Sequence, residues 1–155
     1  MNKTVKHQIG VIFRDVTSLG GLSFFIFISV LVLALHKLDL LKELLLGFVI
    51  TLAVVVMVRT FYFKDRPKKR NYSNYFERIE ASSFPSLHSA RVVFTIAVFV
   101  KYFNQIYATY FLIFMAALVC YSRIYLKKHD WVDITFGAIL GYLTFFIVGM
   151  IVGII

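Results

Sequence analysis

The 155-residue chain is 60% hydrophobic and carries a formal net charge of +9 at pH 7. Its mean hydropathy of +0.81 excludes an ordinary soluble domain, which would carry more charged and fewer large apolar side chains. A basic chain can bind nucleic acid, anionic lipid or a phosphorylated substrate. Nucleic acid fits this chain least well, because so apolar a sequence contains no soluble basic domain that could bind it. Anionic lipid and phosphorylated substrates are the partners left.

The first polar segment, residues 1–16, mixes basic and apolar side chains and precedes a long hydrophobic run. Lys3, Lys6 and Arg14 are interspersed with aliphatic residues, a pattern typical of a helix that lies on the membrane surface. A cleaved signal peptide is not expected from so polar a start.

Five hydrophobic runs follow, and a bilayer core needs about 20 helical residues to cross. We expect about five spanning helices, at 18–36, 43–62, 88–103, 107–125 and 132–154. Backbone groups inside the bilayer must be satisfied internally, so the prediction is an all-α integral membrane bundle. One domain is expected to cover residues 1–155.

Glycines recur at intervals of four in the last predicted span, as Gly137 and Gly141 and again as Gly149 and Gly153. Small residues at this spacing allow the backbones of two membrane helices to approach closely. The pattern therefore favours close packing of this helix against a neighbour.

Threading five spans through a bilayer separates the polar segments into two faces. The N-terminal segment and the loops at 63–87 and 126–131 share one face. Of the 17 Lys and Arg residues, all except Lys37, Lys42 and Lys101 lie on that face. We therefore expect the chemistry there.

Three polar clusters lie at helix ends on this basic face: Arg59 with Arg66, Ser86 with His88, and Arg123 with His129 and Asp133. His129 and Asp133 stand at i and i+4, so they are neighbours on a helical face. The carboxylate can hold the Nδ1 hydrogen of the imidazole and leave Nε2 free as a nucleophile. His88 can protonate a leaving alkoxide.

The other side chains of these clusters suit a phosphate group. Arg59, Arg66 and Arg123 keep their charge and present planar forks that match phosphate oxygens. Ser86 and the free N–H groups at the start of the third span add neutral donors. Phosphoryl transfer needs mainly charge stabilisation and in-line placement. Nothing in this set requires a metal or another cofactor, and none is expected.

The three clusters resemble the signature of the type-2 phosphatidic acid phosphatase (PAP2) superfamily, which reads K-x6-RP, PSGH and SR-x5-H-x3-D. The counterparts are Arg59-x6-Arg66-Pro67, Pro85-Ser86-Leu87-His88 and Ser122-Arg123-x5-His129-x3-Asp133. The resemblance implies a His129 nucleophile aided by Asp133, with His88 as the acid. It also implies that Arg59, Arg66, Ser86 and Arg123 hold the phosphate.

The chain departs from this signature at two positions. Arg59 stands in place of the family's Lys, and the nearby Lys64 is the other candidate for that role. Leu87 stands in place of the family's Gly, although its backbone N–H can still donate to phosphate. Lys64, Lys128 and Tyr125 are further candidates for contact with a lipid head group.

The resemblance implies a membrane-embedded lipid phosphatase whose substrate keeps its acyl or isoprenoid tail in the bilayer. Candidate substrates are phosphatidylglycerol phosphate, phosphatidic acid, a polyprenyl diphosphate and the 1-phosphate of lipid A. One alternative is a lipid phosphotransferase that uses the same phosphohistidine. The other is a non-catalytic protein that binds anionic lipid.

Two indications of membrane sidedness conflict. The basic excess of the active face favours the cytoplasm by the positive-inside rule. Several of those charges are expected to bind phosphate, however, and many bacterial members of the resembled family face the periplasm. The resemblance therefore favours an active site on the periplasmic face of the inner membrane. The sequence does not indicate an oligomeric state.

Overall fold

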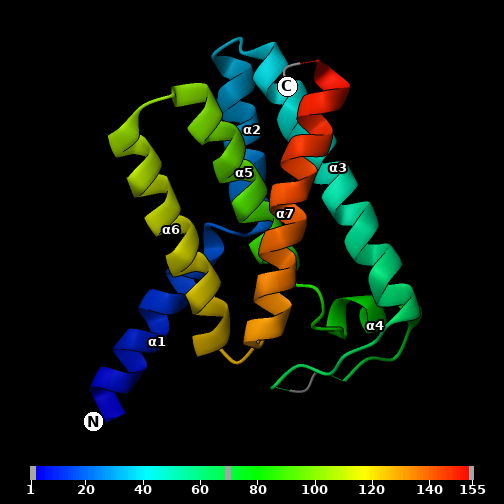
Figure 1. Cartoon of the computed structure of the whole chain (residues 1–155). Helices are drawn as coiled ribbons and strands as arrows, with labels where there is room; N and C mark the ends of the chain where they lie inside the picture. Colours follow the sequence, from blue (N-terminus) through cyan, green and yellow to red (C-terminus); the bar gives the residue numbers. More distant parts are fainter. Residues whose placement is uncertain (1–2, 69–70, 154–155) are drawn as a thin grey trace.

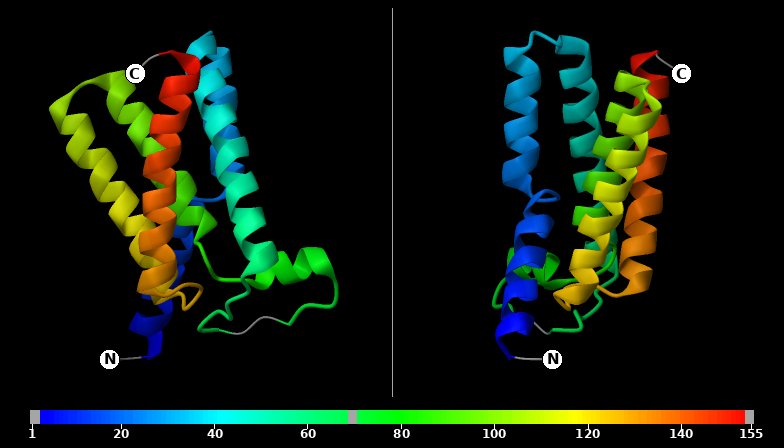
Figure 2. Two further views of the ribbon diagram at one scale, coloured as in Figure 1. Left: turned by 45° about the vertical axis from the view of Figure 1, so that its right-hand side comes forward. Right: turned by 90° about the vertical axis from the view of Figure 1, so that its left-hand side faces the viewer.

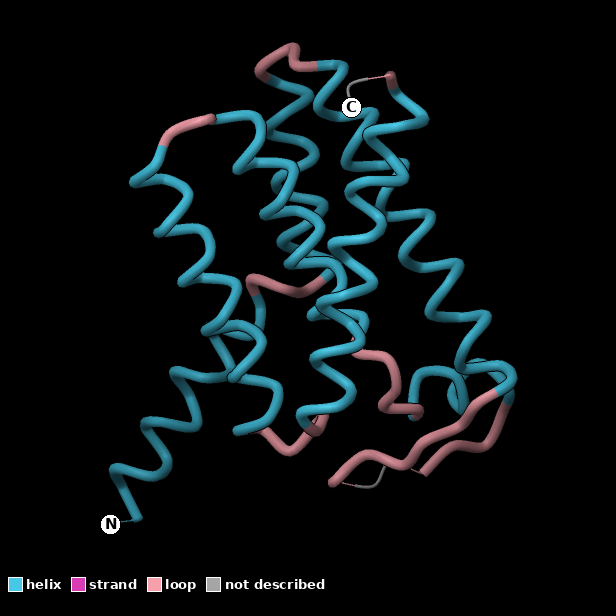
Figure 3. The backbone as a smooth tube through the Cα atoms, viewed as in Figure 1, coloured by secondary structure: helices cyan, strands magenta, loops and turns pink. Residues whose placement is uncertain are grey.

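The computed structural model describes residues 3–68 and 71–153, and all regular elements among them are helices (Figure 3). The helices are α1 (Lys3–Ser18), α2 (Leu22–Ala34), α3 (Leu38–Phe61), α4 (Tyr75–Ala81), α5 (Leu87–Phe103), α6 (Ile106–Tyr125) and α7 (Trp131–Val152). The predicted all-α fold is confirmed.

Three helices, α3, α6 and α7, are long and apolar enough to cross a membrane. A fourth candidate is the pair α1 and α2, taken as one span with a bend of 44°. Helix α5 has 17 residues and runs beside α7 through the bundle (Figure 1). The chain is therefore an integral membrane protein, for which the predicted count of five spans is approximate.

The largest difference from the prediction lies near the N-terminus. The span expected at 18–36 is shorter than predicted, because α2 covers only Leu22–Ala34 and a break separates it from the helix that ends at Ser18. Helix α2 has 13 residues, and at 1.5 Å per residue it spans about 20 Å, too little for a bilayer core of roughly 30 Å. Helix α1 packs on α6, where the ring centroids of Phe13 and Tyr125 lie 4.3 Å apart. The helix predicted to lie on the membrane surface thus belongs partly to the bundle.

Helix α5 lies at the centre of the bundle, in contact with α3, α6 and α7 (Figures 1 and 2). The loop between α3 and α5, which contains α4, and the loop between α6 and α7 lie together at the lower end in Figure 1. The N–H of Lys68 joins these loops by donating to the carbonyl of Lys127, at 3.0 Å. The C-terminal end of α7 lies at the opposite end (Figure 1).

Two glycines of α7 allow α5 to approach closely. A Cβ on Gly137 would lie 2.5 Å from the carbonyl oxygen of Ser86, and one on Gly141 would lie 2.2 Å from that of Ala90. Only glycine fits at such distances, so the predicted close packing is confirmed at these two positions. The N–H of Ser86 also donates to the carbonyl of Asp133, at 3.0 Å. This crossing fixes the start of α5 against the start of α7.

The hydrophobic core lies between α2, α3, α5 and α7 and contains Phe25, Val32, Leu40, Leu44, Phe94, Val98 and Val148. The ring of Phe94 fills the space beside Gly47, where a Cβ would lie 1.9 Å from the ring. Large apolar side chains, such as Phe27, Val49 and Phe114, are also exposed on the outside of the bundle. Exposed apolar area of this extent suits contact with lipid.

Gly141→Ala should destabilise the bundle by about 1–3 kcal/mol, because the added methyl group is forced against the α5 backbone. In an open helix the same change is neutral or stabilising, since Ala has the higher helix propensity. Gly10→Ala is the matched control, because nothing lies within 4 Å of a Cβ added there. Thermal unfolding in detergent measures both variants, and equal melting temperatures would contradict the close crossing.

Candidate active site

The three sequence motifs meet at the lower end of the bundle in Figure 1, where α3 and α6 end and α5 and α7 begin. Arg59 and Arg66 are both close enough to Arg123 to interact with it electrostatically. His88 lies close enough to Arg123 and His129 to interact with both electrostatically. The folded chain therefore brings together residues that are up to about half the sequence apart.

Helix α7 begins with a reciprocal pair of hydrogen bonds that orients Asp133. The Asp130 side chain accepts the N–H of Asp133 at 3.0 Å, and the Asp133 side chain accepts the N–H of Asp130 at 3.1 Å. Such a capping box satisfies N–H groups at the helix start that have no partner within the helix. It also turns the Asp133 carboxylate back toward His129. In the sequence, this capping box is indicated by two acidic residues three positions apart, Asp130 and Asp133, at the start of an apolar run.

His129 and Asp133 form a buried pair, with side chains that are 2% and 0% exposed. Nδ1 of His129 lies 3.6 Å from Oδ2 of Asp133, slightly beyond hydrogen-bond distance. Nε2 lies 3.4 Å from Nη2 of Arg123. A guanidinium can only donate, so Nε2 is the acceptor in this contact and the ring proton sits on Nδ1, facing Asp133. This tautomer leaves a lone pair on Nε2.

The charge state of His129 follows from its surroundings. Burial lowers the pKa of His129, the Asp133 carboxylate opposes that effect, and the positive charges of Arg123 and Arg66 lower the pKa further. The net pKa lies below the ordinary value of about 6.5. The imidazole is therefore neutral at pH 7, as a nitrogen nucleophile must be.

Lys64 bridges the two carboxylates at the start of α7. Its Nζ lies 2.6 Å from Oδ2 of Asp130 and 2.8 Å from Oδ1 of Asp133. Partial burial alone would lower the pKa of Lys64, but the hydrogen bonds to both carboxylates outweigh it and raise the pKa. Lys64 therefore stays charged and stabilises the ionised form of Asp133.

Arg59 and Arg66 donate to backbone carbonyls of the α4 segment. Nη1 of Arg59 donates to the Ile79 carbonyl at 3.1 Å, and Nη2 donates to the Pro85 carbonyl at 2.8 Å. Nη2 of Arg66 donates to the carbonyl of Glu80. These bonds hold the segment before α5 against the end of α3. Arg59, expected as a phosphate ligand, thus has both terminal nitrogens engaged with the backbone.

Arg123 is held from the opposite side by the N-terminal helix. Its side chain is 3% exposed, and Nη1 donates to Oγ1 of Thr17 in α1 at 3.1 Å. Thr17 is itself buried. Sequence reasoning missed this residue, because nothing in the sequence links it to an arginine 106 positions away.

Ser86 is the N-cap of α5 rather than a free hydroxyl. Its Oγ accepts the N–H of Ser89 at 3.4 Å and the hydroxyl of Ser89 at 3.0 Å. Leu87 is the first residue of the helix, so its N–H is one of the donors that have no partner within α5. His88 follows in the first turn and lies beside Gly20, where an added Cβ would be 3.6 Å from the His88 ring carbon Cδ2.

The two remaining candidates for head-group contact differ in their positions. Lys128 is exposed beside His129 and is a charged neighbour of His88. Tyr125 instead packs its ring on Phe13 of α1. Lys128 is thus exposed to solvent next to His129, whereas Tyr125 takes part in a contact between helices.

Comparison with known proteins identifies the family and the fold of the chain. Residues 40–153 match the PAP2 superfamily, and the chain belongs to that superfamily. The crystal structure of Aquifex aeolicus LpxE is similar to this chain, with a TM-score of 0.76 and 23% identity over 91% of this chain and 85% of that one. No curated protein matches the sequence.

A second similar structure is that of the first transmembrane PAP2 type phosphatidylglycerolphosphate phosphatase from Bacillus subtilis. Its TM-score is 0.75, with 23% identity over 93% of this chain and 76% of that one. At this identity, both structures establish a shared fold. The resemblance stated from the three sequence motifs is confirmed at the level of the family.

Lys64→Met should lower the free energy of unfolding by about 1–3 kcal/mol, because it leaves the buried Asp133 carboxylate without its ion-pair partner. Asp130→Asn is the matched control, since Asn can still cap α7 and the lost pair is partly exposed. Thermal unfolding at pH 7 in detergent should show a clearly larger loss for Lys64→Met. A loss at least as large for Asp130→Asn would contradict the role given to the buried pair.

Proposed function

We propose that this protein is a lipid phosphatase that works through a phosphohistidine intermediate. The observation that carries the proposal is the buried His129–Asp133 pair, whose unprotonated Nε2 faces the guanidinium of Arg123. A nucleophilic nitrogen beside fixed positive charge suits attack on the phosphorus of a bound phosphate. The membership of the PAP2 superfamily and the similarity to a phosphatidylglycerolphosphate phosphatase support the same reaction.

In the first step, Nε2 of His129 attacks phosphorus in line with the bond to the lipid oxygen. The N–P bond forms, the P–O bond breaks, and His88 transfers a proton to the departing lipid alkoxide. The imidazole becomes cationic as it bonds to phosphorus, and the Asp133 carboxylate stabilises it through the Nδ1 hydrogen. The distance of 3.6 Å between Nδ1 and Oδ2 would shorten in that state.

In the second step, water attacks the phosphohistidine from the side that the lipid alcohol has left. His88, now neutral, accepts a proton from the water, the O–P bond forms, and the N–P bond breaks. Inorganic phosphate is released and His129 returns to its neutral form. The alternative, transfer to another lipid hydroxyl, would use the same intermediate with a different acceptor.

The proposed phosphate site contains Arg66, Arg123 and the N–H groups at the start of α5, including that of Leu87. Arg123 already contacts Nε2 of His129, so a phosphate that binds its guanidinium lies beside the nucleophile. Arg59 would take part mainly by holding Ile79 and Pro85, the carbonyl groups just before α5. Lys64 would keep Asp133 ionised, and Ser86 would cap the helix that carries His88.

Fixed guanidinium groups can supply the positive charge that phosphoryl transfer requires, so we propose that the reaction needs no metal ion. The transition-state charge would fall on Arg66 and Arg123, which stay protonated at any working pH. The tails of the lipid would remain between the apolar helices. The ionised phosphate would lie at the polar lower end of the bundle.

His129→Gln should abolish the release of inorganic phosphate from phosphatidic acid in detergent micelles, because the nitrogen lone pair of the glutamine amide is delocalised and cannot attack phosphorus. The activity of the unmodified protein should survive EDTA. His7→Ala, a histidine change on the exposed face of α1, is the matched control and should keep full activity. Retention of activity by His129→Gln, or its loss in EDTA, would contradict the mechanism.

Thr17→Val should lower kcat about tenfold, because a hydrogen bond to a charged partner is lost and Arg123 is held less firmly beside His129. Ser18→Ala removes a neighbouring hydroxyl that bonds only within α1, and serves as the matched control. Phosphate-release kinetics should show the loss chiefly in kcat for Thr17→Val and no loss for Ser18→Ala. Equal rates for the two variants would contradict a role for α1 in positioning Arg123.

A further inference from the structure

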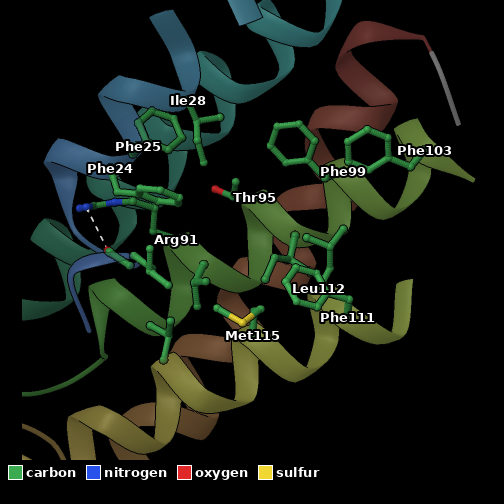
Figure 4. A pocket seen from close by; sticks show the side chains of 15 residues that line it. Phe24, Phe25, Ile28, Arg91, Thr95, Phe99, Phe103, Phe111, Leu112 and Met115 are labelled. Carbon is green, nitrogen blue, oxygen red and sulfur yellow. Dashed lines mark hydrogen bonds between the residues drawn. The ribbon is translucent and has the colours of Figure 1, made fainter. Parts of the chain in front are cut away.

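An apolar cavity of about 320 Å³ lies between α2, α5 and α6 (Figure 4). Its lining includes Phe25 and Ile28 of α2, Phe99 of α5, and Leu112 and Met115 of α6. A volume of roughly 300–1,000 Å³ is usual for a cavity that binds a small molecule. The lining is suited to a hydrocarbon chain.

One end of the cavity adjoins the active site. Gly20 and Val119 both line it, and a Cβ on Gly20 would lie 2.8 Å from Val119 and 3.6 Å from the His88 ring. His88 therefore sits just beyond this end. This end of the cavity is therefore the end nearer to the proposed phosphate site.

Two polar side chains, Arg91 and Thr95, interrupt the apolar lining. They are 6% and 8% exposed, and Nε of Arg91 and Oγ1 of Thr95 have no hydrogen-bond partner within the described part of the chain. Figure 4 shows the Thr95 hydroxyl directed into the space between α2 and α5. Buried polar groups in proteins nearly always have partners, so this pair requires an explanation.

The structural role of Arg91 explains only part of this pair. Its Nη1 donates to the Gly20 carbonyl at the break between α1 and α2, at 3.3 Å, and its guanidinium lies 5.3 Å from the ring centroid of Phe48. Neither contact involves Nε, and neither accounts for the Thr95 hydroxyl. A plain hydrocarbon chain would fill the cavity but would leave both groups without an acceptor.

The spacing of these groups along α5 indicates what kind of acceptor would fit. His88, Arg91 and Thr95 follow one another at i, i+3 and i+7, so they share one helical face. At 1.5 Å per residue, Arg91 and Thr95 lie about 4.5 Å and about 10 Å further along the axis than His88. In a glycerophospholipid the ester carbonyls come shortly after the phosphate, where the acyl chains begin.

We propose that this cavity binds the first part of an ester-linked acyl chain, with Arg91 and Thr95 donating hydrogen bonds to the ester carbonyl. The proposal rests on the proposed function and narrows its substrate to lipid phosphates that carry acyl chains. An isoprenoid phosphate has no carbonyl group at this depth and would leave both donors unsatisfied. The cavity thus selects the lipid by the linkage of its chain as well as by its phosphate.

The test compares ester-linked dioleoyl phosphatidic acid with its ether-linked dialkyl counterpart in the same detergent micelles. The protein should prefer the ester lipid by about tenfold in kcat/KM, the effect of one hydrogen bond to a charged or buried donor. Thr95→Val, which keeps the shape of the side chain, should reduce this preference several-fold. Thr95→Ser restores the hydroxyl and should restore the preference.

Equal kcat/KM for the two lipids in the unaltered protein, or an unchanged preference in Thr95→Val, would overturn the proposal. Met115→Trp fills the cavity and should lower turnover of both lipids relative to turnover of p-nitrophenyl phosphate. An unchanged ratio would equally count against the cavity.

A binding measurement separates this proposal from the proposed function. In the His129→Gln variant, the ester lipid should raise the melting temperature more than the ether lipid, whether or not the protein hydrolyses either one. An equal rise with both lipids would overturn the cavity proposal. Absence of phosphate release from every substrate, together with a larger rise for the ester lipid, would contradict only the proposed function.

Discussion

The close crossing of α5 and α7 is the contact on which the rest of the site depends. Gly137 and Gly141 bring the α7 backbone against carbonyl groups of α5. The hydrogen bond from Ser86 to the Asp133 carbonyl is made where the two helices begin. This contact sets the position of the proposed acid relative to the proposed nucleophile, because each histidine lies within a few residues of it. If these helices were further apart, the two histidines would also be further apart, even with every proposed catalytic side chain unchanged.

The arginine side chains of the site and of the neighbouring part of α5 are oriented mainly by hydrogen bonds to neutral oxygen atoms. Arg59 and Arg91 donate to carbonyl groups, and Arg123 donates to a hydroxyl group. A neutral acceptor fixes the direction of a guanidinium without cancelling its charge, whereas a carboxylate would do both. Lys64, by contrast, is paired with two carboxylates. The cluster therefore keeps a positive field, which suits the phosphate group of the proposed substrate.

Much of this arrangement follows from patterns that are visible in the sequence. The apolar runs from 43 onward predict four helices within a few residues of their observed bounds, because length and hydropathy decide membrane helices. The i, i+4 spacing predicts that His129 and Asp133 lie close together, although His129 precedes the N-cap Asp130 and the capping box turns the carboxylate toward it. The break after Ser18 and the contact of Thr17 with Arg123 were not predictable, because they depend on how α1 packs against α6. The engagement of Arg59 with backbone carbonyls likewise depends on the path of the loop through α4.

The contact between α1 and α6 has a consequence for how the protein is made. Synthesis proceeds in chain order, so α1 is complete long before Arg123, the residue that it contacts 106 positions later. His129 and Asp133 arrive later still, at the start of the final helix. A chain that has been synthesised only as far as α6 therefore lacks both residues of the proposed nucleophilic pair. The proposed site is complete only when the last helix has packed against α5.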